Sequence, residues 1–141
     1  MRPIRYLLRT PLLLLHLLVS LPLTLLVVTL PFLAHRRTHA GEPWGHRMIR
    51  WWSLLLMRVF GFRVERIGEP LPGAVMFVAN HVSWMDIELM HSQCMMGFVA
   101  KAEISRWPLV GWLASRGETI YHHRGSNDSL HGVMHQMVQR L

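Results

Sequence analysis

The chain has few of the features that would narrow its class at once: it lacks paired cysteines and is short of acidic side chains. One cysteine in 141 residues excludes an internal disulfide. Only 8 acidic residues stand against 15 Lys and Arg, which gives a formal net charge of +7. No internal repeat or low-complexity segment is present. The length allows one modest domain, or less once a membrane segment is subtracted.

The positive charge is concentrated in the first half of the chain. Residues 1–66 hold 10 Arg and 2 Glu, whereas residues 67–141 hold 5 basic and 6 acidic side chains. The basic half also contains the most apolar segment of the sequence. Arginine beside hydrocarbon indicates anionic lipid headgroups, and nucleic acid is disfavoured because the arginines do not form an aromatic-interleaved stripe.

One long segment has no charged residue at all, from Thr10 to Ala34. As a helix, the 23 residues from Leu12 would be about 34 Å long, enough for a hydrocarbon core of about 30 Å. A signal peptide is disfavoured, because the run is too long and no small-residue cleavage site follows it. Because of Pro22 and Pro31, a re-entrant segment remains an alternative to a transmembrane one.

The stretch "WGHRMIRWWSLLLMRVFG" predicts a second helix that ends near Gly61. Its tryptophans and arginines suit a membrane interface, while packing on a soluble core remains the alternative. Residues 1–60 are therefore predicted to form a hydrophobic helical membrane anchor.

Residues 61–141 predict the first part of an α/β domain. Strands are expected over residues 62–68, 74–79, 95–100 and 118–122, and helices over residues 83–93, 107–115 and 126–141. Strands that alternate with helices indicate a mainly parallel sheet. Because so few strands are placed, the domain is expected to be incomplete.

The stretch "VMFVANHVSWMD" places His81 directly after an apolar run that predicts a buried strand. Open α/β sheets bind ligands at this edge. Asp86 would then lie in the first turn of the next helix, where its carboxylate can orient the histidine ring as a general base. The alternative is a capping box formed by Ser83 and Asp86, which alone would explain the aspartate.

A second pair has the same spacing, His123 and Asp128 in "HRGSND". A glycine-containing loop separates the two residues, and Asp128 is more simply explained as a helix N-cap. Only the first pair is interpreted as catalytic.

The sequence resembles the glycerolipid acyltransferases, which include 1-acylglycerol-3-phosphate acyltransferase. "NHVSWMD" resembles the NHxSxxD signature of that family, and "FVAKAEISRWPLVGWLA" looks like the segment that follows it. "ETIYHHRG" is similar to the second motif of the family, G-x-I-F-I-x-R. The resemblance extends from about Val75 to Arg124.

This resemblance implies roles for four residues. His81 would be the general base on the acceptor hydroxyl, and Asp86 would orient and charge-stabilise it. Arg124 would bind the phosphate of the acceptor, with Lys101 a further candidate for the same anion. No metal and no cofactor is implied. The acyl donor would be acyl-CoA or acyl carrier protein, and membrane lipid would be a partner.

The same resemblance implies membrane-bound acyl transfer in phospholipid biosynthesis, at the cytoplasmic membrane with the site facing the cytoplasm. The expected acceptor is 1-acylglycerol-3-phosphate, with a lyso-ornithine lipid or another lysophospholipid as the alternative. Glu118 stands where the second motif has glycine, and His122 and His123 replace its apolar and acidic residues, which leaves the headgroup open.

The third and fourth motif blocks of the family are not found before Leu141. The chain as given is therefore expected to be an inactive N-terminal fragment. A different class of function stays open, namely a catalytically inactive, membrane-anchored protein that binds lipid or a partner.

Overall fold

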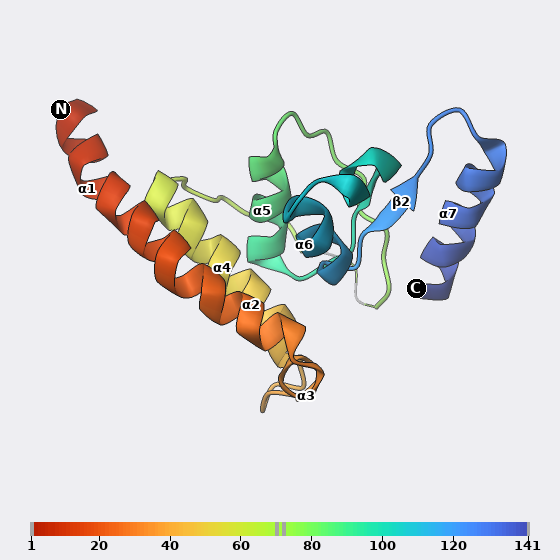
Figure 1. Cartoon of the computed structure of the whole chain (residues 1–141), viewed down its shortest axis with the longest axis horizontal. Coiled ribbons are helices and arrows are strands. Elements are labelled where there is room, and N and C mark those ends of the chain that lie inside the picture. The colour runs from red at the N-terminus through yellow and green to blue at the C-terminus, as the bar shows by residue number, and fades with distance from the viewer. Residues whose placement is uncertain (1, 70, 72, 141) are drawn as a thin grey trace. The chain divides into compact units, whose positions relative to one another are not determined.

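The computed structural model describes residues 2–69, 71 and 73–140 (Figure 1). The chain divides into two units. The first contains residues 1–66 and 81–95, and the second contains residues 67–80 and 96–141. The domain boundary after residue 60 stays a prediction.

The first unit begins with a nearly continuous helix. Its parts are α1 (Arg2–Leu15), the π-helical turn η1 (His16–Ser20) and α2 (Leu21–Thr29), and the short α3 (Pro31–Ala34) follows. Leu30 separates α2 from α3 because it is extended, as the residue before a proline tends to be. The stretch Tyr6–Thr29 is long and apolar enough to cross a membrane, by length and composition. The predicted apolar helix is thus present, and it ends at Thr29.

Helix α4 (Trp44–Phe60) lies beside α2 in the first unit (Figure 1). Gly61 ends it in the left-handed conformation, with φ of 75°, which glycine adopts without steric cost. Phe62 N–H donates to the Met57 carbonyl at 3.0 Å, and this bond closes the helix end. Helix α4 also packs on α5 (Trp84–Gln93), and Leu56 and Met57 of α4 are buried. The predicted second helix and its end are confirmed.

A line of polar side chains lies where the N-terminal helix meets α4. His16, Ser20 and Thr24 recur every fourth residue and are all buried. The Ser20 hydroxyl lies 2.7 Å from Nδ1 of His16, and the His16 ring stacks on Trp52 at 4.9 Å between centroids. Most of the leucines on the other faces are exposed. The N-terminal helix therefore turns its polar stripe inward and its apolar surface outward.

The second unit contains a two-stranded parallel sheet and three helical segments. Strands β1 (Val99–Lys101) and β2 (Ile120–His122) pair with Lys101 opposite His122. The connection between them holds the 3₁₀-helix η2 (Ala102–Arg106) and α6 (Val110–Arg116), and α7 (Asn127–Arg140) packs on β2. Ala102, Ile120 and Val133 are the buried apolar residues of this unit.

Two of the expected strands are absent from the described structure. The prediction of strands over residues 62–68 and 74–79 is wrong, since neither segment forms a strand. Residues 74–79 form no regular secondary structure and are largely exposed, with Val78 85 % exposed. A strand requires hydrogen bonds from a neighbour, and no described strand pairs with this segment. The parallel α/β organisation is confirmed only for β1 and β2.

Candidate functional site

The first histidine–aspartate pair lies at the start of α5. Ser83 is the N-cap, and its hydroxyl accepts from the N–H of Met85 at 3.2 Å. Oδ2 of Asp86 accepts from the N–H of Ser83 at 2.9 Å and from that of Val82 at 3.0 Å. The expected capping box is therefore present, and it fixes the Asp86 carboxylate above the first turn of the helix.

The surroundings of Asp86 stabilise its ionised form. The backbone N–H of Ser83, then that of Val82, lower the pKa of this carboxyl, and the Ser83 hydroxyl and the charge of His81 act in the same direction. Hydrogen bonds to a carboxylate favour its charged state. Asp86 thus supplies a fixed negative charge near His81.

His81 lies two residues before the N-cap and is exposed. Within the described residues, no hydrogen bond joins its ring to Asp86, and the two interact through their charges. The structure places the first pair within electrostatic range of each other, and His81 is exposed. This arrangement can stabilise an imidazolium that forms when the ring takes a proton. The catalytic assignment of His81 and Asp86 stays a prediction.

Helix α5 is held against α4 by a hydrogen bond that sequence analysis missed. The hydroxyl of Ser53, which is fully buried on α4, donates to Oε2 of Glu88 at 2.6 Å. Glu88 lies two residues after Asp86, so this bond fixes the helix that carries the capping box. The two residues are 35 positions apart, and no local pattern joins them.

The second pair, His123 and Asp128, has a different environment. The N-terminus of α7 is capped by Ser126, whose hydroxyl accepts from the N–H of Ser129 at 3.1 Å. The Ser129 hydroxyl in turn accepts from the N–H of His123 at 2.8 Å. The prediction that Asp128 is the N-cap is wrong, because the serine two residues earlier occupies that position.

The two phosphate-binding candidates follow the parallel strands of the second unit. Lys101 ends β1, and Arg124 comes two residues after the end of β2, before Gly125. Both side chains are exposed. Carboxyl ends of parallel strands meet at one edge of a sheet, where ligands bind. Since these residues and the first pair belong to different units, their assignment to one site remains a prediction.

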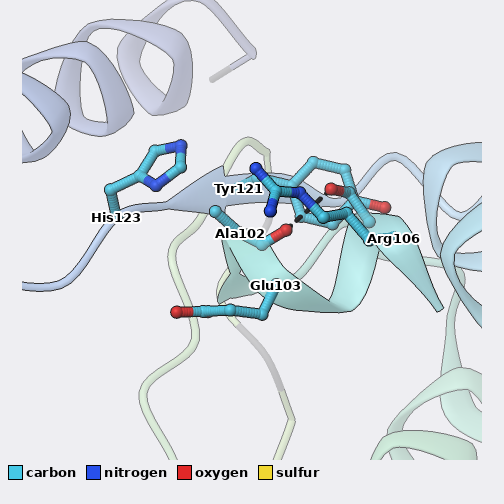
Figure 2. Close-up of a pocket in the computed structure, with 6 residues that line it drawn as sticks. Ala102, Glu103, Arg106, Tyr121 and His123 are labelled. Atoms are coloured by element: carbon cyan, nitrogen blue, oxygen red, sulfur yellow. Dashed lines mark hydrogen bonds between the residues drawn. The ribbon is translucent and has the colours of Figure 1, made fainter.

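A cavity of about 290 Å³ lies between η2 and β2 in the second unit (Figure 2). Its lining consists of Ala102, Glu103, Ser105, Arg106, Tyr121 and His123. Sequence analysis missed Glu103 and Arg106, although both lie in the quoted "KAEISR" segment. The signal available in the sequence was the spacing of Glu103 and Arg106, two opposite charges three residues apart.

No group of three or more His, Cys, Asp or Glu side chains that could hold a metal ion occurs in the described part of the chain. The histidines near β2 therefore do not form such a group with the acidic residues around them. His122 instead has its Nδ1 3.1 Å from the hydroxyl of Ser129.

Comparison with known proteins places these residues in a family. The family model for acyltransferases matches residues 63–141. The chain belongs to the acyltransferase family. The matched region contains both histidine–aspartate pairs and both phosphate-binding candidates. No solved structure gives a significant match.

Two kinds of curated relative match the chain. It is 42 % identical over 87 residues to a lyso-ornithine lipid O-acyltransferase of Pseudomonas aeruginosa, which covers 62 % of this chain and 34 % of that protein. It is 32 % identical over 81 residues to a 1-acyl-sn-glycerol-3-phosphate acyltransferase of Neisseria gonorrhoeae, which covers 57 % of this chain and 32 % of that protein. The chain thus spans about a third of the length of these relatives.

Proposed function

We propose that the protein transfers a fatty acyl group from acyl-CoA or acyl carrier protein to the hydroxyl of a lyso-lipid at a membrane. The observation that carries this proposal is the Asp86 carboxylate, which the backbone N–H groups of Val82 and Ser83 fix at the start of α5, five residues after the exposed His81 and inside the region that matches the acyltransferase family. The named activities of the two relatives support a lyso-lipid as acceptor.

The proposed reaction uses His81 as general base. Its ring nitrogen takes the proton of the acceptor hydroxyl while the oxygen attacks the thioester carbonyl of the donor. The thioester bond then breaks, and the leaving thiolate takes the proton back from the imidazolium. Asp86 stabilises the imidazolium between these two transfers, and its capping hydrogen bonds keep it ionised for that task.

The N-terminal helix supports a membrane location for this reaction. Leu7, Leu14 and Leu18 are 76, 53 and 73 % exposed, on the faces of the helix that do not pack on α4. Apolar surface of this kind binds hydrocarbon. The polar stripe of the N-terminal helix packs on α4, and α4 carries three arginines. These two features favour a pair of helices that enters the membrane from one side, and they disfavour a single isolated transmembrane helix.

The higher sequence identity to the lyso-ornithine lipid acyltransferase favours lyso-ornithine lipid as the acceptor. 1-Acylglycerol-3-phosphate is the second candidate. Membranes that carry the product of the reading frame containing residues 1–141 would be given labelled acyl-CoA or acyl carrier protein and each acceptor in turn. We expect acyl transfer to a lyso-lipid, with faster transfer to lyso-ornithine lipid. A folded protein that acylates neither acceptor would contradict the proposal and would favour the inactive, membrane-anchored alternative.

A further inference from the structure

The cavity between η2 and β2 is lined by one acidic and one basic side chain, and both come from η2. Glu103 and Arg106 are three residues apart in η2, and side chains at this spacing stand one above the other in a 3₁₀-helix. Both residues are exposed. Two such neighbours on an ordinary surface are well placed to pair with each other.

They do not pair. In the part of the chain that the structure describes, neither Glu103 nor Arg106 takes part in an ion pair. Figure 2 shows the Glu103 carboxylate and the Arg106 guanidinium pointing to different sides of Ala102. The guanidinium lies toward Tyr121, and the ring of His123 lies beyond it along β2. The cavity therefore offers a negative group and a positive group that are separated in space.

The walls of the cavity are braced. Gly111 of α6 packs so closely on η2 that a Cβ at this position would clash with the carbonyl oxygen of Ser105. The Tyr121 hydroxyl donates to the carbonyl of Gly111 at 3.1 Å, which ties β2 to the same helix. Ser105 donates to the carbonyl of Ala102 at 2.7 Å within η2. These contacts hold the backbone that carries Glu103 and Arg106 before any ligand binds.

We propose that this cavity binds a zwitterionic lipid headgroup, with Glu103 on its ammonium and Arg106 on its carboxylate. An ornithine headgroup whose α-nitrogen is acylated keeps one carboxylate and one side-chain ammonium, which matches the two separated charges. A glycerol phosphate headgroup has no cation, so it leaves Glu103 without a partner. The inference rests on the proposed acyl transfer for its choice of lipid, and it makes Glu103 the residue that distinguishes the two acceptors.

The first test measures acceptor KM in the product of the reading frame that contains this chain. Glu103→Gln should raise the KM for lyso-ornithine lipid about tenfold, since it removes one charge-assisted hydrogen bond. The same variant should leave the KM for 1-acylglycerol-3-phosphate within about twofold. Arg106→Gln should raise the KM for both acceptors, because both carry an anion. Glu65→Gln and Arg63→Gln, exposed side chains outside the cavity, are the controls.

The second test does not require catalysis. Binding of Nα-acetylornithine and of Nα-acetylnorvaline, which lacks the ammonium, would be followed by NMR on the full chain in non-ionic micelles. We expect the ornithine derivative to bind more tightly, to shift the signals of Tyr121 and His123, and to lose its advantage in Glu103→Gln.

The two tests separate the inference from the proposed function. Equal binding of the two probes, or an ornithine preference that survives Glu103→Gln, overturns the headgroup site. An equal effect of Glu103→Gln on the KM values of both acceptors overturns it as well. Selective binding of the ornithine derivative by a protein without acyl transfer would retain the site and overturn only the activity.

Discussion

The two histidine–aspartate pairs have the same spacing in the sequence and different environments in the structure. In the first unit, Asp86 accepts two backbone hydrogen bonds and interacts with the charge of His81. In the second unit, Ser126 and Ser129 satisfy the backbone around His123, and no described interaction joins that histidine to Asp128. A capping box is thus compatible with a catalytic carboxylate, because the bonds that cap the helix also keep the acid ionised.

The largest expected effect distinguishes the pairs by activity. General-base catalysis is worth about 10²- to 10⁴-fold, so His81→Ala should lower kcat by that amount. His123→Ala should lower it by no more than about tenfold, because this side chain lines the cavity and takes no proton in the proposed reaction. Circular dichroism of both variants would verify the fold. An inactive His123→Ala beside an active His81→Ala would assign catalysis to the second pair.

The next largest effect is expected from substitution of Arg124, on the KM for the acceptor that carries a phosphate. A guanidinium binds phosphate through two parallel hydrogen bonds, and a lysine cannot reproduce both. Arg124→Ala should therefore raise the KM for 1-acylglycerol-3-phosphate about tenfold or more, with little change in the KM for the acyl donor. Arg124→Lys should recover part of the loss. Arg116→Ala is the control, and equal changes in both KM values would remove Arg124 from the acceptor site.

The structure confirms the elements that local signals specify. Ser83 begins α5, Gly61 ends α4, and both positions follow from the chemistry of the residue itself. The segment over residues 74–79 has the composition of a buried strand, yet pairing depends on a neighbour that composition does not identify. The prediction for the apolar run therefore failed where those for the helix ends succeeded.

The site residues show the same limit of local information. The capping box of Ser83 and Asp86, which is the alternative to a catalytic role in the sequence analysis, is present, and its hydrogen bonds also lower the pKa of the Asp86 carboxyl. The bond between Ser53 and Glu88 spans 35 residues, so only the packing of α4 on α5 reveals it. Glu103 and Arg106 were visible in the sequence, but their failure to pair with each other was not.

Ser53 provides a smaller effect, which tests how the first pair is supported. Ser53→Ala leaves the partly buried Glu88 carboxylate without its hydroxyl partner, so the free energy of unfolding should fall by about 1–3 kcal/mol. Glu88→Gln keeps an acceptor for the hydroxyl and should cost about 1 kcal/mol or less. Ser115→Ala removes an exposed hydroxyl of α6, so it should change the free energy of unfolding by no more than about 0.5 kcal/mol. Urea denaturation measures all three, and equal losses for Ser53→Ala and Ser115→Ala would show that the α4–α5 bond does not stabilise the unit.

The smallest expected effect is a dependence of stability on pH that arises from Asp86. Its folded-state pKa lies below the ordinary value of 3.8, so the unfolded chain takes up this proton first as the pH falls. The stabilisation is therefore complete above that ordinary value, and it is lost as the pH falls through the folded-state pKa. Asp86→Asn should remove this part of the acid sensitivity, whereas Asp128→Asn should keep it. Urea midpoints of both variants and the unmodified chain, compared at about pH 6 and about pH 3, measure the difference. If Asp128→Asn reduced the acid sensitivity and Asp86→Asn did not, the second pair would hold the stabilised carboxylate.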